Sequence, residues 1–271
     1  MARCNCDESV DLLECLECGF QYFDPQLAGD ERFYYSLDVG DDLYYNKLRP
    51  EFDVAVTLAT ERGYSSVFDI GCGSGSFLDL ARRKALTTFG LELNSGAADA
   101  AGAKGHQIWK ELIDNTFVEA HCGKYDLVTM FQVMEHVANP VELLAKASEL
   151  LTDRGALMIS VPNRQGTYQL FPLDPHQWPP HHLSRWRPED FMKLATEANL
   201  RLETISGDLT RGAEIVERFT ANETMKKHLG RPASGIPLPL VRSIALLYRK
   251  LGLKYVVRNR GTSIYATYSR K

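Results

Sequence analysis

Short apolar runs alternate with helical stretches from Ser65 to the end of the chain. This alternation is typical of an α/β domain with helices around a mainly parallel sheet. We therefore expect a doubly wound fold. The runs that predict strands are 66–70, 88–93, 107–109, 125–131, 156–161, 200–206 and 262–268.

Helix signals lie between these runs. Asn94 is a suitable N-cap after the second run, and Asn139-Pro140-Val141-Glu142 supplies a cap, an N1 proline and an acid, which predicts a helix to about Leu151. Further helices are expected at 48–58, 77–81 and 188–199. About 55 residues separate the last two strands, which is too long for a hairpin loop, so helices at 211–229 and 239–252 are expected there as a cap or interface element.

The texture of the sequence divides the chain into three parts. Residues 1–30 hold four of the six cysteines, and residues 31–64 are rich in Tyr, Asp and Leu and predict a helical lid. Residues 65–271 form the predicted cofactor-binding domain, with a helical insertion at 207–261. The expected chain is thus one large domain with a small Cys-rich segment at its N-terminus.

The composition is that of an ordinary globular protein, with 44% hydrophobic and 24% charged residues. The net charge of −4 does not indicate a nucleic-acid partner. Charge is unevenly spread, however, because residues 240–271 carry eight bases and no acid. This basic tail permits an anionic acceptor or a homodimer interface, and solvated terminal faces are the simpler interpretation.

No run reaches the roughly 18 apolar residues of a membrane span, and the N-terminus lacks the apolar core of a signal peptide. Cysteines without a secretory signal favour reduced thiols or metal ligands over disulfides. We therefore expect a cytoplasmic protein with no membrane partner.

A glycine-rich turn follows the first strand. Asp69-Ile70-Gly71-Cys72-Gly73-Ser74-Gly75 places three glycines at alternate positions, where the backbone can bend sharply and approach a ligand closely. Glu92 ends the second strand, at the position suited to accept hydrogen bonds from ribose hydroxyls. Strand, glycines, helix, strand and acid in this order predict a nucleoside cofactor.

The spacing of the glycines bears on which cofactor this is. A nicotinamide dehydrogenase has Gly-x-Gly-x-x-Gly, whereas this chain has Gly71-x-Gly73-x-Gly75 with Asp69 in front. An acid at the end of the first strand would repel a pyrophosphate but suits a ligand with an ammonium and a sulfonium group. The pattern favours S-adenosylmethionine.

At these residues the sequence resembles the class I S-adenosylmethionine-dependent methyltransferases, in the small-molecule branch that includes ubiquinone-biosynthesis-type enzymes. The resemblance covers roughly residues 45–206, and its motifs are Asp69–Gly75, Glu92 and Phe131-Gln132-Val133-Met134-Glu135-His136. It implies a seven-stranded sheet whose last strand is antiparallel. It also implies a cofactor site at Asp69, Gly71, Gly73, Gly75, Glu92, Leu93, Phe131 and Gln132. The residue beside the adenine stays open among Glu111, Leu112 and Asp114.

A histidine-rich segment, Pro179–Trp186, follows the fifth strand on the edge expected to hold the cofactor. Since histidine titrates near neutrality, His181 or His182 can remove the proton from a hydroxyl or amine acceptor, and we favour His181. A packed structural role for one of the pair is the alternative. The further candidates are His136, His176 and Asp174, together with Tyr168, Phe171 and Trp178 as either an aromatic wall around the acceptor or core.

Four thiols lie within fifteen residues at the N-terminus, as Cys4-x-Cys6 and Cys15-x-x-Cys18-Gly19. Four thiolates can close a tetrahedral structural zinc site, although the one-residue gap in the first half departs from the usual spacing. Some methyltransferases of the same branch carry a similar zinc-ribbon-like segment. Reduced thiols in a frayed terminus are the alternative.

The stretch before the sheet domain holds Tyr45 and Arg49, and in related enzymes such a segment folds over the cofactor, where either residue would reach its carboxylate. The sequence therefore predicts methyl transfer to oxygen or nitrogen of a small molecule. An NAD(P)-dependent oxidoreductase and a non-catalytic cofactor-binding scaffold are the alternatives.

Overall fold

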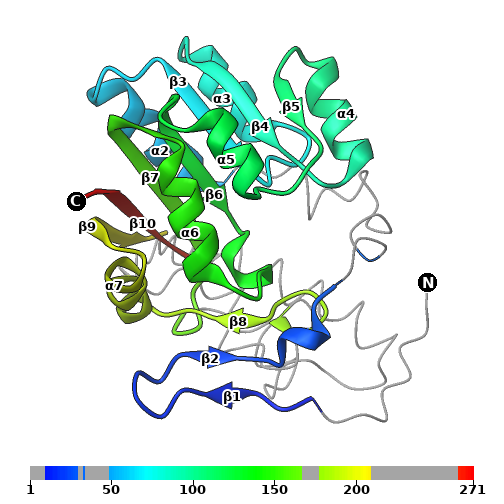
Figure 1. Ribbon diagram of the computed structural model, residues 1–271, viewed down its shortest axis with the longest axis vertical. Helices are drawn as coiled ribbons and strands as arrows, with labels where there is room; N and C mark the ends of the chain where they lie inside the picture. The colour runs from blue at the N-terminus through cyan, green and yellow to red at the C-terminus, as the bar shows by residue number, and fades with distance from the viewer. Residues whose placement is uncertain (1–9, 30–32, 34–48, 167–176, 209–261) are drawn as a thin grey trace, which may run out of the picture.

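The computed structural model describes residues 10–29, 33, 49–166, 177–208 and 262–271 (Figure 1). The helices expected at 211–229 and 239–252 lie outside these residues, as do Cys4, Cys6 and Tyr45.

Seven strands form the main sheet, in the order β5-β4-β3-β6-β7-β10-β9. The strands β3 to β7 pair in parallel, whereas β10 is antiparallel to both β7 and β9. The expected doubly wound sheet with an antiparallel last strand is confirmed. The strands are β3 (Ser66–Ile70), β4 (Thr87–Leu91), β5 (Gln107–Trp109), β6 (Tyr125–Phe131), β7 (Leu151–Pro162), β9 (Leu200–Gly207) and β10 (Ser263–Arg270).

Helices cover both faces of this sheet (Figure 1). On one face, Phe52 and Phe77 pack with Leu127 and Met158, and on the other, Phe117 and Leu144 belong to the larger core. Because a parallel sheet is buried on both sides, its strands read as nearly continuous apolar runs. The helices are α2 (Pro50–Glu61), α3 (Ser76–Arg83), α4 (Ser95–Ala103), α5 (Asn115–His121), α6 (Pro140–Glu149) and α7 (Pro188–Glu197).

A second, three-stranded antiparallel sheet was not predicted from the sequence. It has the order β1-β2-β8, formed by β1 (Leu13–Glu14), β2 (Gln21–Tyr22) and β8 (Ser184–Arg185). Figure 1 shows it beside η2 (Met134–His136), the 3₁₀ turn that follows β6, and another turn, η1 (Pro25–Leu27), follows β2. The N-terminal hairpin is thus joined to a strand within the histidine-rich segment.

Most element boundaries agree with the sequence within two residues. The largest difference is at β7, which begins at Leu151 rather than Ala156, because Leu151 pairs with Tyr125 across an irregularity in the ladder. The predicted cap at Asn94 is confirmed, since its side chain accepts a hydrogen bond from the N–H of Ala97 at 3.0 Å. Among the described residues, no helix is long and apolar enough to cross a membrane.

Candidate functional site

The turn from β3 into α3 runs through three glycines in the left-handed region, with φ of +74° at Gly71, +54° at Gly73 and +82° at Gly75. At Gly71 an added Cβ would also lie 2.7 Å from Cγ2 of Val133, in the segment after β6. Backbone conformation and space therefore both demand glycine here. The bare backbone of this turn lies at the carboxyl edge of the sheet, where open α/β sheets bind ligands.

Glu92 holds this turn from the neighbouring strand. One oxygen of its carboxylate accepts the N–H of Gly73 at 2.9 Å, and the other accepts the N–H of Asn94 at 2.7 Å. Burial raises the pKa of Glu92, while these backbone donors oppose the rise. Since each carboxylate oxygen has further acceptor capacity, Glu92 can still accept hydrogen bonds from vicinal hydroxyls.

Asp69 lies beneath the turn, fully inside the sheet. Its carboxylate accepts the Thr129 hydroxyl at 2.7 Å. Burial, aided by the nearby charge of Glu92, raises the pKa of Asp69 to about 8. A cationic ligand beside this carboxyl would favour its ionised form and would be attracted in return.

The end of β6 brings the remaining predicted cofactor residues to the same edge. The ring of Phe131 packs against those of Phe52 and Phe77, at 5.0 and 4.8 Å between centroids. Gln132 has φ of +57°, a strained conformation for a residue with a side chain. Its amide nitrogen donates to the hydroxyls of Ser160 and Ser263, at 3.2 and 3.4 Å, so the strain fixes the direction of this side chain.

The 3₁₀ turn after β6 carries a buried carboxyl group that faces two imidazoles. Oε1 of Glu135 lies 3.8 Å from Nε2 of His136 and 3.9 Å from Nε2 of His182. Within the described part of the chain, neither oxygen of Glu135 has a hydrogen-bond partner, although the residue is only 1% exposed. Burial raises the pKa of Glu135 to about 8. One ligand atom from each residue lies within 4.8 Å of the others, so the three could hold a divalent cation.

Glu51, at the start of α2, is a second buried carboxyl group at this edge, and sequence reasoning missed it. Its Oε1 accepts the Ser160 hydroxyl at 3.1 Å, while no described residue bonds its Oε2. Burial raises the pKa of Glu51, and the charge of Glu51 in turn raises that of Glu135. In sequence, an acid in the first turn of an amphipathic helix resembles a surface residue favoured by the helix dipole, so only the fold identifies it.

The histidine-rich segment docks onto the same turn. The N–H of Leu183 donates to the carbonyl of Glu135 at 2.7 Å, and Nδ1 of His136 bonds the carbonyl of His181. Burial lowers the pKa of His136 to about 4, so this ring is neutral at pH 7. His182 faces Glu135, whereas the ring of His181 lies edge-on to Phe33 at 4.8 Å.

The other predicted residues are distributed as follows. Trp178 packs 5.4 Å from Phe23 and beneath the guanidinium of Arg185, which is a packing role. The positive charge of Arg49 lowers the pKa of Glu51 and of Glu135, so this side chain lies near the two buried carboxyl groups. The positions expected to supply further candidates, Tyr168, Phe171, Asp174 and His176, lie outside the described residues.

After β5, Asp114 caps α5 by accepting the N–H of Phe117 at 2.8 Å. Leu112 is 63% exposed, and Glu111 is also exposed. Asp114 is exposed as well, and one oxygen of its carboxylate serves the cap, so all three residues remain accessible candidates for a contact with the adenine.

Cys15 and Cys18 lie in the turn between β1 and β2, where the N–H of Gly19 donates to the carbonyl of Cys15 at 2.7 Å. Backbone hydrogen bonds from Cys18 and Glu17 lower the pKa of the Cys15 thiol. Both cysteines are free thiols, and Cys4 and Cys6 lie outside the described residues.

Curated proteins similar to this chain include ubiquinone biosynthesis O-methyltransferases. The chain is 26% identical over 152 residues to the ubiquinone biosynthesis O-methyltransferase of Psychrobacter arcticus, covering 54% of this chain and 59% of the relative. The enzyme of the same name from Thiobacillus denitrificans is 26% identical over 52% of this chain and 66% of its own length. The chain thus spans about three-fifths of the length of these relatives.

Solved structures share the fold at low identity. A possible histamine N-methyltransferase from Thermotoga maritima has a TM-score of 0.52 and 17% identity, over 89% of this chain and 91% of its own. Magnesium protoporphyrin IX methyltransferase from Synechocystis, solved with bound SAM, has a TM-score of 0.53 and 13% identity, over 90% of this chain and 99% of its own. The family model described as a methyltransferase domain matches residues 45–205. With the predicted fold, glycine turn and acid in place, the chain belongs to this methyltransferase-domain family.

Proposed function

We propose that this protein transfers a methyl group from S-adenosylmethionine to a hydroxyl or amine of a small molecule. The observation that carries the proposal is the glycine turn held by Glu92, with Asp69 beneath it. Two carboxyl groups beside bare backbone suit a nucleoside that bears positive charge, and they disfavour the pyrophosphate of a dinucleotide. The family match and the methyltransferase relatives support the same assignment.

The cofactor residues take separate roles in this proposal. Asp69, with the backbone of Gly71, Gly73 and Gly75, receives the methionine part, and Glu92 receives the ribose hydroxyls. Leu93 flanks the adenine. Phe131 and Gln132 border the end of the cofactor that carries the methyl group, because Phe131 ends β6 and Gln132 follows it at the same edge.

The cofactor supplies a methyl group activated by a positively charged sulfur. As the methyl carbon forms its bond to the acceptor oxygen or nitrogen, its bond to sulfur breaks and the acceptor loses a proton. We assign that proton to His182, which faces Glu135 on the turn after β6. His181 remains the alternative base. Most of the rate acceleration comes from alignment of acceptor, methyl and sulfur.

Two buried carboxyl groups limit the charge that the reacting group of the acceptor can carry. Glu51 and Glu135 have oxygens without partners among the described residues, at the edge where the acceptor has to meet the methyl group. Burial raises the pKa of both groups, so they ionise most readily beside a cationic group, whereas an anionic group would raise their pKa further. We therefore propose a neutral or cationic reacting group, and any anionic part of the acceptor lies away from this edge.

We also propose a structural zinc held by Cys4, Cys6, Cys15 and Cys18. The turn around Cys15 and Cys18 directs backbone N–H groups at sulfur and lowers a thiol pKa, which favours the thiolates that zinc requires. Metal analysis of the full chain tests this proposal. About one zinc per chain is expected, reduced in Cys15→Ser and unchanged in Cys122→Ser, an exposed free thiol. Near-zero zinc in the wild type would contradict it.

Isothermal titration of the full chain tests the cofactor. S-adenosylhomocysteine is expected to bind and NAD is not; binding of NAD alone would favour an oxidoreductase. Transfer of labelled methyl from S-adenosylmethionine to a small-molecule extract tests turnover. A wild type that binds the cofactor but labels nothing, across extracts from several sources, would favour a non-catalytic scaffold.

A further inference from the structure

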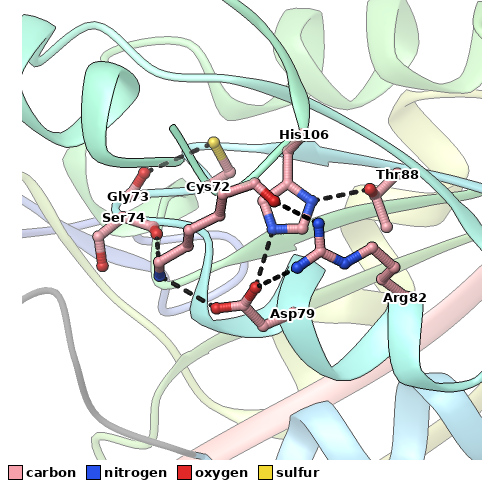
Figure 2. Close-up of polar contacts among 8 residues, drawn as sticks. Cys72, Gly73, Ser74, Asp79, Arg82, Thr88 and His106 are labelled. Carbon is pink, nitrogen blue, oxygen red and sulfur yellow. Dashed lines mark hydrogen bonds and ion pairs between the residues drawn. The ribbon is translucent and has the colours of Figure 1, made fainter. Parts of the chain in front are cut away.

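A polar cluster lies beside the glycine turn and connects α3, α4, β4 and the residue before β5. Figure 2 shows Asp79 and Arg82 of α3 together with His106 and Thr88, close to Ser74. Nζ of Lys104, the C-cap of α4, donates to the carbonyl of Ser74 at 2.6 Å and pairs with Oδ2 of Asp79 at 3.0 Å.

The cluster fixes Lys104 from several directions. Arg82 bonds the backbone carbonyl of Lys104 and pairs with Oδ1 of Asp79 at 3.3 Å. His106, whose side chain is fully buried, lies 3.1 Å from the same Oδ1 through Nε2. Its Nδ1 lies 2.8 Å from the Thr88 hydroxyl (Figure 2). The aspartate thus holds three basic side chains in one arrangement.

The same cluster also packs against the turn itself. An added Cβ at Gly75 would lie 3.1 Å from Cδ2 of His106 and 3.1 Å from Cβ of Ala101 in α4. The turn is therefore held on two sides, by Glu92 at the N–H of Gly73 and by Lys104 at the carbonyl of the next residue, Ser74. These two contacts fix the N–H of the Cys72–Gly73 peptide and the carbonyl of the Ser74–Gly75 peptide, the peptide groups on either side of the one between Gly73 and Ser74.

We propose that Lys104, braced by Asp79, is a positioning residue that holds the glycine turn in its cofactor-binding conformation. The proposal rests on the proposed function, since the turn is the assigned S-adenosylmethionine site. Lys104 touches neither the cofactor nor the acceptor in this assignment. It lowers the cost of ordering the turn before the ligand binds, which is the effect of preorganisation on affinity.

The expected signature is a change in cofactor affinity without a change in turnover. In Lys104→Met, the Kd for S-adenosylhomocysteine and the KM for S-adenosylmethionine should both rise about five- to tenfold, with kcat at saturating cofactor unchanged. Lys104→Arg keeps a donor for the carbonyl and a partner for Asp79, so it should restore most of the affinity. Asp79→Asn should behave like Lys104→Met, because it removes the charge that holds the ammonium group in place.

Lys110→Met is the matched control. Lys110 pairs with Asp99 at 2.5 Å on the exposed surface of the same region, with no contact to the turn, and its loss should leave Kd and KM unchanged. Circular dichroism melts show whether each variant is folded. Folded Lys104→Met with wild-type affinity would overturn the proposal, as would an equal loss in Lys104→Met and Lys110→Met. Failure of the wild type to bind S-adenosylhomocysteine would overturn the proposed function and this inference together. This outcome differs from failure of the inference alone, because it is seen in the wild type without any variant.

Discussion

The two halves of the carboxyl edge differ in how completely their acids are bonded. On the side of β3 and β4, Asp69 accepts a hydroxyl and both oxygens of Glu92 accept backbone N–H groups. On the side of β6 and β7, Glu51 and Glu135 keep three oxygens for which the described residues supply no donor. Unbonded buried polar atoms cost folding free energy and persist mainly at functional sites. The difference supports the proposal that the cofactor side is preformed and that a ligand completes the acceptor side.

The largest effect is expected from a substitution that deforms the glycine turn on the side of β3 and β4. Gly71→Ala should weaken S-adenosylhomocysteine binding by about a hundredfold or more, because its Cβ would meet Val133 and its φ is positive. Gly63→Ala is the control, since Gly63 has φ of +63° but nothing within 4 Å of an added Cβ. Isothermal titration measures both. Equal losses in the two variants would show that strain alone, and not the close approach to Val133, is responsible.

A substitution on the acceptor side should lower turnover rather than cofactor affinity. Glu135→Gln should lower kcat about tenfold or more while leaving the Kd for S-adenosylhomocysteine within about twofold of the wild type, because Glu135 faces His182 and not the glycine turn. Turnover with S-adenosylmethionine and titration with the product analogue separate the two effects. A large loss of cofactor affinity would contradict the division of the edge into two halves.

Glu135→Gln should also change how the free energy of unfolding depends on pH. A carboxyl group whose folded pKa is about 8, against about 4.3 unfolded, stabilises the protein below pH 4.3, and this contribution is lost as pH rises through 8. Between pH 6.5 and 8.5 the free energy of unfolding of the wild type should therefore fall by about 1–3 kcal/mol more than that of Glu135→Gln. Urea melts at each pH measure it. Asp69, whose pKa is also raised, lowers the free energy of unfolding with rising pH equally in the wild type and in Glu135→Gln, so it cancels in the difference. His136, with its pKa near 4, changes the free energy of unfolding only below pH 6.5.

The smallest effect is expected at Gln132, where the two halves meet. Gln132→Gly relieves a left-handed conformation but removes the bonds to Ser160 and Ser263. The two changes should nearly cancel, so the free energy of unfolding should change by less than about 1 kcal/mol while kcat falls severalfold. Thermal melts and turnover assays together test this. A large loss of stability without loss of turnover would assign Gln132 to packing alone.

The features that could be predicted from sequence are those formed by contacts between residues close together along the chain. Strands 66–70 and 125–131 were predicted with their observed bounds, because each is a buried run ended by local turn signals. Strand 107–109 was also predicted with its observed bounds, although it is only partly buried. The glycine turn and Glu92 were predictable for the same reason, since their order along the chain encodes the site. The two-residue strand β8 was not, because β2, its sheet partner among the described residues, is about 160 residues away in sequence.

The acceptor side was harder to predict because tertiary contacts bring its residues together. Nothing near Glu51 in sequence shows that its carboxyl is buried beside Ser160, more than a hundred residues later. The histidine pair was found from residue type, whereas Glu135 was noted only as part of the motif Phe131–His136. Only the docking of residues 181–183 on the turn after β6 shows which imidazole faces the buried acid.

A crystal structure of the full chain with S-adenosylhomocysteine tests the central claim most directly. The account predicts ligand density along the backbone of Gly71–Gly75, with the ribose hydroxyls on Glu92 and the sulfur directed toward Phe131 and Gln132. Density for the ligand at any other place, or a glycine turn left bare at saturating ligand, would contradict it.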